Sequence, residues 1–163
     1  LIVGSVQMCI RDSLLFEEEK NGKVEIGIGE ASCAEIDEYN ILNATFMAME
    51  RARAGLKTPP ELALVDGNQK PRRFNCAAQT VVKGDAKSYS ISAASIVAKV
   101  YRDRLMAELA QKYPYYGFEK NAGYGTAAHI AGLKQYGVTP QHRKSYKPIQ
   151  AFMTEKGSAD IDD

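Results

Sequence analysis

The sequence predicts an α/β fold, and three observations support this prediction. A short apolar run at residues 62–65 and a second strand-like run at 77–82 each end in a turn that holds glycine and aspartate, as strands of an α/β sheet do. Apolar residues recur at helical spacing within 32–55 and 91–112. The 163 residues, of which 45% are apolar and 25% charged, suffice for one ordinary core, so we expect a single domain.

The first predicted elements are a strand and a helix. From Val24 the run Val-Glu-Ile-Gly-Ile-Gly alternates apolar with charged or small residues, which predicts a half-buried strand. Ser32 and Glu35 then form a Ser-x-x-Glu capping box. The helix that they begin should end at Gly55, with a break near Asn40.

Two strands, two helices and a tail are predicted beyond that point. The strands are the apolar runs that end at Asp66 and before Lys83. A helix should run from Ile91 to about Lys112, because its first turns carry small residues that pack closely on a sheet. An aromatic, glycine-rich stretch (113–126), a helix from about Ala127, a basic stretch (139–147) and a disordered acidic tail should follow.

The composition excludes several classes of protein. A formal net charge of +1 excludes a strongly basic protein, so any nucleic-acid binding must come from local clusters of Lys and Arg. Cys9, Cys33 and Cys76 lack the spacing of zinc or redox motifs and are expected to be reduced thiols. Because no apolar run reaches the ~18 residues of a membrane span and no signal peptide is recognisable, we expect a cytoplasmic protein without membrane contact.

Asp66 and Asp85 are the candidate metal ligands. Each follows a predicted strand, and functional groups of α/β sheets collect at the carboxyl ends of strands. Oxygen ligands without a His or Cys cluster suit Mg²⁺ or Mn²⁺ and phosphoryl chemistry. Taken singly, each aspartate is better explained by turn or capping chemistry. Together, flanked by lysines and arginines, they favour a metal–phosphate site, and spacing alone leaves the choice open.

Other polar and aromatic residues receive structural interpretations. His129 and His142 are isolated, so neither is assigned a catalytic role. The acidic run 17–19 is expected on a solvated helix face. An aromatic cluster is expected to pack in the core and loops rather than stack on bases: Tyr113, Tyr115, Tyr116 and Phe118.

Seven motifs occur in order: EIDEYNILNATFMAM, LALVDGN, VVKGD, SISAASIVAKVYRD, YGF, GYGT and HRKSY. With them the chain resembles ribonuclease HII from about Leu14 to Phe152. The resemblance implies a ribonuclease H-like fold, a mixed sheet flanked by helices, with a small C-terminal helical region. It also implies metal-dependent hydrolysis of the RNA strand of RNA–DNA hybrids and incision of duplex DNA at single ribonucleotides, as in ribonucleotide excision repair and DNA replication.

The resemblance implies roles for individual residues as well. Asp66 and Asp85 match active-site aspartates that would hold two Mg²⁺ or Mn²⁺ ions about 4 Å apart. Tyr124 matches a tyrosine that packs on the nucleotide beside the ribonucleotide, where the 2′-hydroxyl distinguishes RNA from DNA.

Two basic segments are candidates for contact with backbone phosphates. Arg143, Lys144 and Ser145 form the first, and Lys70, Arg72 and Arg73 form the second. A merely solvated basic loop explains either segment about as well.

The sequence also departs from that family. The strand-borne Asp-Glu pair and the Gly-Arg-Gly loop with which the family begins are not found. We therefore expect residues 1–13 to be a foreign leader, 14–152 to be the C-terminal part of the catalytic domain with its first strands missing, and 153–163 to be a disordered tail.

Three interpretations of function follow. The first is an active ribonuclease HII, expected to be a monomer. The second is a catalytically incomplete fragment that binds RNA–DNA hybrids without cutting them, with an affinity that falls as salt rises. The third is a chain that does not fold alone, because the missing strands would leave apolar faces and strand edges exposed.

Overall fold

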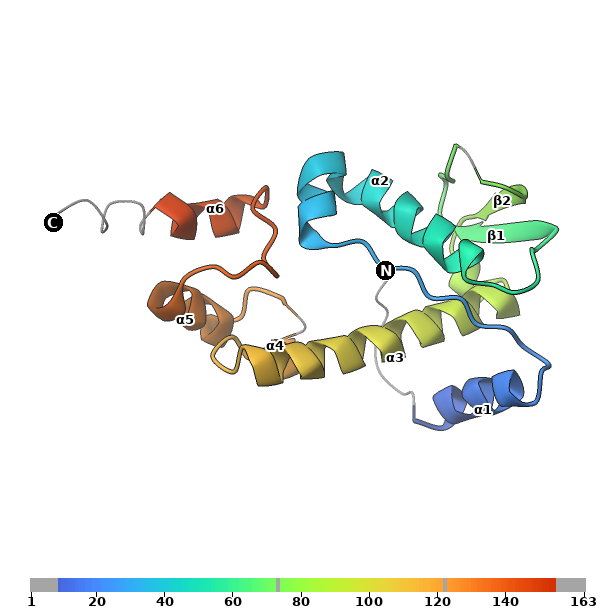
Figure 1. Ribbon diagram of the computed structural model, residues 1–163, viewed down its shortest axis with the longest axis horizontal. Coiled ribbons are helices and arrows are strands. Elements are labelled where there is room, and N and C mark those ends of the chain that lie inside the picture. Colours follow the sequence, from blue (N-terminus) through green and yellow to red (C-terminus); the bar gives the residue numbers. More distant parts are fainter. Residues whose placement is uncertain (1–8, 73, 122, 155–163) are drawn as a thin grey trace, which may run out of the picture. The chain divides into compact units, whose positions relative to one another are not determined.

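The computed structural model describes residues 9–72, 74–121 and 123–154 (Figure 1). The described residues fall into two compact units. Unit 1 holds residues 9–31 and 42–102, and unit 2 holds residues 32–41 and 103–154. Each unit has its own set of elements and is treated separately below. The predicted disordered tail lies largely in 155–163, outside the described residues.

The sheet lies in unit 1 and consists, within the described residues, of two parallel strands. β1 (Leu62–Asp66) pairs with β2 (Ala77–Val81), in a register that runs from Leu62 opposite Ala77 to Asp66 opposite Val81. Both predicted strands are confirmed. Val65 is 5% exposed, whereas Leu62 and Leu64 are 52% and 38% exposed, so β1 buries one face and presents the other.

Two long helices pass from one unit to the other. α2 (Cys33–Ala54) begins at the predicted capping box: the Ser32 N–H donates to Glu35 Oε2 at 2.8 Å, and the Glu35 N–H donates to Ser32 Oγ at 3.2 Å. The break expected near Asn40 is confirmed, since Asn40 has φ 67° and ψ 166°. α3 (Tyr89–Lys112) confirms the second long helix.

The remaining elements of unit 1 are one helix and one short helical turn. α1 (Cys9–Lys20) precedes the extended segment that leads to α2, and a single turn of 3-10 helix, η1 (Gly84–Ala86), follows β2. Small and branched side chains form the buried part of the unit: Ala44, Ala48, Val65, Ile91, Val97 and Val100. No described helix is both long enough and apolar enough to cross a membrane.

The strand predicted from Val24 to Gly29 is wrong, because residues 24–30 form no strand. The small residues of this segment lie against the backbone of α2 instead. A Cβ added at Gly27 would lie 2.0 Å from the Ala52 carbonyl oxygen, and one at Gly29 would lie 2.0 Å from that of Ala48. The alternation therefore reflects two glycines that bring this segment against the backbone of α2, not the two faces of a sheet.

Unit 2 is helical apart from its loops. α4 (Phe118–Asn121), α5 (Ala127–Tyr136) and α6 (Lys147–Thr154) follow the end of α3. α5 starts at the predicted place, capped by Thr126, whose hydroxyl oxygen accepts the His129 N–H at 3.3 Å. α6 lies in the small C-terminal helical region that the resemblance implies, and Pro148 near its start is a typical helix-initiating residue.

The core of unit 2 is aromatic, which confirms the packing role predicted for Tyr113, Tyr116 and Phe118. Tyr116 and Phe118 are each 3% exposed and stack with ring centroids 5.6 Å apart. Leu133 and Ile149 complete the buried cluster. Tyr115 lies outside it, 56% exposed and stacked on Tyr136 at 3.9 Å.

Candidate active site

Asp66 is the last residue of β1 and is held by a backbone donor from the neighbouring strand's end. The Gly84 N–H donates to Asp66 Oδ1 at 2.7 Å. The parallel register continues one residue further, because the Gly67 N–H donates to the Val81 carbonyl at 3.0 Å. The Asp66 side chain is therefore held by one main-chain donor just beyond the end of β2, and no described residue donates to its Oδ2.

The turn that supplies this donor has an unusual backbone. Lys83 is left-handed, with φ 55° and ψ 49°, which directs the following N–H toward Asp66. Gly84 is buried, and a Cβ there would lie 2.5 Å from Ile91 Cδ1 and 3.2 Å from Asp66 Oδ1. A side chain at this position would have to displace the end of the Ile91 side chain and would crowd the Asp66 carboxylate.

Asp85 follows Gly84 directly, so its backbone lies near the Asp66 carboxylate that Gly84 contacts. Asp85 is exposed, and its Oδ1 accepts the Ala86 N–H at 3.0 Å. Lys83 and Lys87 on either side are exposed as well. Sequence reasoning did not single out Tyr89, which is 98% exposed at the start of α3 and follows this turn.

The carboxylate groups of these residues suit a hard divalent cation. Asp66 and Asp85 offer carboxylate oxygens, the ligands that Mg²⁺ and Mn²⁺ prefer. Across the part of the chain that the structure describes, no group of three or more His, Cys, Asp or Glu side chains is arranged to hold a metal ion. The two aspartates fit such a cation in kind, and by themselves they supply only part of a coordination shell.

Tyr124, in unit 2, is 63% exposed and stands on a loop organised by a buried asparagine. Asn121, 6% exposed, donates from Nδ2 to the Tyr116 carbonyl at 2.7 Å and accepts the Gly123 N–H on Oδ1 at 2.8 Å. The Tyr124 N–H donates to the Asn121 carbonyl at 2.8 Å. The ring of Tyr124 is therefore presented to solvent from a fixed backbone, which suits an aromatic contact with a ligand.

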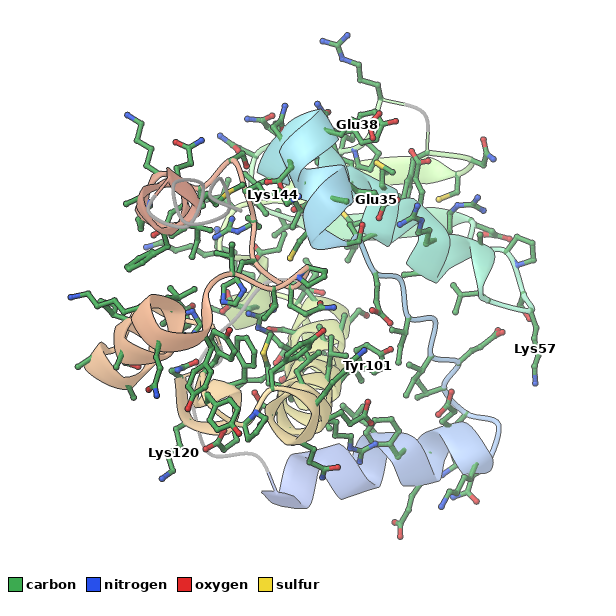
Figure 2. All side chains as sticks on the ribbon, turned by 60° about the vertical axis from the view of Figure 1, so that its left-hand side comes forward. Glu35, Glu38, Lys57, Tyr101, Lys120 and Lys144 are labelled. Atoms are coloured by element: carbon green, nitrogen blue, oxygen red, sulfur yellow. The ribbon has the colours of Figure 1, made fainter. Side chains whose placement is uncertain are left out.

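Arg143, Lys144 and Ser145 form a loop in unit 2 whose backbone is bound to Asp37 of α2. The Lys144 N–H donates to Asp37 Oδ2 at 2.7 Å, and the Ser145 N–H donates to Oδ1 at 2.9 Å. Burial raises the pKa of Asp37, but the hydrogen bonds from Ser145 and Lys144 and the charge of Arg143 outweigh it and hold this pKa below its usual value. Figure 2 shows Lys144 beside the first turns of α2, which carry Glu35 and Glu38.

The second basic segment, Lys70 to Arg73, is less available for contact with phosphates. Lys70 donates from Nζ to the Ala78 carbonyl at 2.5 Å, so its ammonium is bound to the backbone of β2. Arg72 is exposed, and Arg73 lies outside the described residues.

His129 and His142 are buried together, 3% and 6% exposed, with their Nε2 atoms 3.3 Å apart. The Thr139 N–H donates to His142 Nδ1 at 3.0 Å, so the proton of His142 is on Nε2 and points to His129. His129 then holds its proton on Nδ1, 3.1 Å from the Tyr116 carbonyl. Burial, and then the charge of His129, lower the pKa of His142. The hydrogen bonds of both rings lie within the core of unit 2.

Sequence reasoning missed Gly84, Asp37 and Asn121. Each acts by a hydrogen bond that places another candidate residue. Gly84 directly precedes the candidate Asp85, so its position in the sequence could have indicated it. The partners of Asp37 are 107 and 108 residues away, so no local pattern indicates that residue.

Comparison with known proteins identifies the family. The family profile described as Ribonuclease HII matches residues 12–149. The chain is 61% identical to the ribonuclease HII of Rhodospirillum rubrum over 127 residues, which cover 78% of this chain and 58% of the relative. It is 47% identical to that of Roseobacter denitrificans over 149 residues, which cover 91% of this chain and 75% of the relative. The chain thus spans less than two thirds of the Rhodospirillum rubrum protein.

The fold matches as well. The crystal structure of the ribonuclease H2 from Pyrococcus horikoshii OT3 superposes with a TM-score of 0.58 and 29% sequence identity, over 78% of this chain and 67% of that one. The predicted ribonuclease H-like α/β fold is therefore confirmed. On the profile match, the sequence identities and this shared fold, the chain belongs to the ribonuclease HII family.

Proposed function

We propose that this protein hydrolyses the RNA strand of RNA–DNA hybrids and incises duplex DNA at single ribonucleotides, with Mg²⁺ or Mn²⁺ as cofactor. The observation that carries the proposal is the pairing of Asp66 with the turn before Asp85, through the 2.7 Å hydrogen bond from the Gly84 N–H. Family membership supplies the reaction class.

Asp66 and Asp85 are the residues that would hold the cations. When bound, divalent cations supply Lewis-acid activation of the attacking water and stabilisation of the departing 3′ oxygen. The Gly84 N–H fixes the orientation of the Asp66 carboxylate through Oδ1, which keeps Oδ2 available as a ligand. Asp85, exposed between Lys83 and Lys87, faces solvent, from which a phosphate group would arrive.

Substrate recognition falls to unit 2. The exposed ring of Tyr124 would pack on the nucleotide next to the ribonucleotide, whose 2′-hydroxyl distinguishes RNA from DNA. The side chains of Arg143 and Lys144 would bind backbone phosphates, which positions a duplex without reading its sequence.

Cleavage of a labelled DNA duplex that contains one ribonucleotide tests the proposal. We expect the chain to cut with Mg²⁺ or Mn²⁺, and we expect Asp66→Asn to lower the rate by at least about 100-fold, because the amide is a poor ligand for a hard cation. Glu61→Gln, which removes the same charge from an exposed residue just before β1, is the matched control and should leave the rate unchanged.

Two outcomes would count against the proposed chemistry. Equal cutting by the Asp66→Asn variant and the parent chain would show that Asp66 is not a ligand. Absence of cutting by the parent chain, with hybrid binding retained, would favour a second function, binding without cleavage. That alternative draws support from the finding that the described residues bring together no cluster of three or more metal-ligating side chains.

A further inference from the structure

The loop that carries Arg143 and Lys144 is anchored to α2 by one carboxylate. Three donors converge on Asp37: the Lys144 N–H on Oδ2 at 2.7 Å, and the Ser145 N–H and hydroxyl on Oδ1 at 2.9 Å and 2.5 Å. A charged acceptor with three donors is among the stronger hydrogen-bond arrangements in proteins. The loop is thus bound at its basic end to a helix 107 residues earlier in the chain.

Two further contacts hold the residues just before this end. The Cys33 thiol donates to the Gln141 carbonyl at 3.0 Å, again from the start of α2. On the other side, His142 is buried against His129 and accepts the Thr139 N–H. The backbone from Gln141 to Ser145 is therefore fixed from the helix and from the core of unit 2.

This anchoring decides which groups of the loop can meet a ligand. The backbone amides of Lys144 and Ser145 and the Ser145 hydroxyl already donate to Asp37, so they are not available to a phosphate. The Lys144 side chain remains exposed. The Arg143 guanidinium lies 4.9 Å from the centre of the Tyr146 ring, which supports its planar group. These two cationic side chains therefore remain to bind phosphate.

We propose that Asp37 is a positioning residue for phosphate binding: it holds the Arg143–Ser145 backbone so that the two cationic side chains are ordered before the nucleic acid arrives. Ordering in advance lowers the entropy lost on binding. This inference rests on the proposed function, because it takes the loop as a contact for the phosphates of an RNA–DNA hybrid.

The direction in which Asp37→Asn changes the affinity for a hybrid distinguishes a positioning role from a purely electrostatic one. Asp37 is an anion beside a proposed anion-binding loop, so removal of its charge alone should tighten binding of a hybrid. Asp37→Asn also replaces one accepting oxygen by an NH₂ donor that faces backbone N–H groups, which should release the loop and weaken binding. Glu38→Gln removes the same charge from the neighbouring exposed residue and is the matched control.

The experiment measures binding of a fluorescent RNA–DNA hybrid to the full chain, in a chelator and over a range of salt concentrations. We expect Asp37→Asn to raise Kd about tenfold and to reduce the salt slope by about one phosphate contact, as Lys144→Ala should. The Glu38→Gln control should not weaken binding. The double variant Asp37→Asn/Lys144→Ala should bind no more weakly than the weaker single variant, because Asp37 acts through the loop that carries Lys144.

Unchanged or tighter binding by Asp37→Asn, or additive effects in the double variant, would overturn the inference. Hydrogen exchange supplies a readout that needs no ligand: the Lys144 and Ser145 amides should exchange faster in Asp37→Asn, and unchanged exchange would also refute the anchoring. Neither measurement depends on cleavage. A chain that binds as expected but does not cut would retain this inference and lose the proposed catalysis.

Discussion

Gly84 lies where an added Cβ would collide with the end of the Ile91 side chain. Its N–H serves as the donor to Asp66, and its missing Cβ leaves room for Ile91 Cδ1, which would otherwise lie 2.5 Å away. A substitution to alanine keeps the donor and adds only bulk. Gly84→Ala therefore tests whether the exact position of the Asp66 carboxylate matters when its hydrogen bond is retained.

We predict that Gly84→Ala lowers the cleavage rate by roughly 100-fold, because a displacement near 1 Å at a catalytic group has effects of that order. The unfolding free energy should fall by about 1–3 kcal/mol from overpacking. Ile91→Val removes the colliding Cδ1 atom, so the double variant should recover part of both losses. The comparison requires cleavage rates and urea unfolding of the four proteins. Failure of Ile91→Val to restore any activity would show that the collision is not the cause.

At this scale the sequence supports only part of the site. Asp66 and Asp85 could be nominated because acidic residues at consecutive strand ends are a local pattern. Asn121 could not, because its role depends on Tyr116 and Gly123 closing a loop around a buried amide. Asp37 depends on partners more than one hundred residues away. Positioning residues are defined by tertiary contacts, which spacing does not encode.

The elements that were predicted correctly carry strong local signals. α2 begins at a reciprocal Ser32–Glu35 capping box and breaks at Asn40, and both strands end at turns. The strand prediction for residues 24–30 was wrong because small and apolar residues alternate in the same way whether the small residues face a sheet or a helix. Only the packing of Gly27 and Gly29 on α2 distinguishes the two cases.

This packing gives a prediction for the element. Gly29→Ala would place a Cβ 2.0 Å from the Ala48 carbonyl oxygen and 2.4 Å from the Ala52 nitrogen, both backbone atoms that cannot rotate away. We expect a loss of about 1–3 kcal/mol in the unfolding free energy. Gly55→Ala is the control, because its Cβ would meet only the ordinary contacts of 3.5 Å and 3.6 Å, with a change under about 1 kcal/mol. Equal stabilities, measured by urea unfolding, would mean that the segment does not pack on α2.

For the whole molecule, two groups predict how stability depends on pH. Burial and the charge of His129 lower the pKa of His142 below 6.5, so the unfolded chain takes up a proton first and stability falls as the pH drops below about 6.5. The pKa of Asp37 lies below 3.8, so its contribution is present above that value and is lost only as the pH falls further. Two separate windows of acid destabilisation are therefore expected.

Urea unfolding between pH 4.5 and 8 isolates the histidine window. His142→Asn should flatten the decline near pH 6.5 while lowering stability at neutral pH, because Asn does not titrate and loses the contact with His129. Asp37→Asn should leave the decline near pH 6.5 unchanged. A decline that persists in His142→Asn would assign the titration to another group.

The exposed face of β1 has a consequence for the candidate metal ligand. Alternate residues of a strand share a face, so Asp66 stands on the same side as the exposed Leu62 and Leu64. Whatever covers these leucines, whether protein or nucleic acid, also removes water from around the carboxylate. The local dielectric constant then falls, and the attraction between Asp66 and a cation grows in proportion. A partner that covers Leu62 and Leu64 would therefore also strengthen the attraction between Asp66 and its cation.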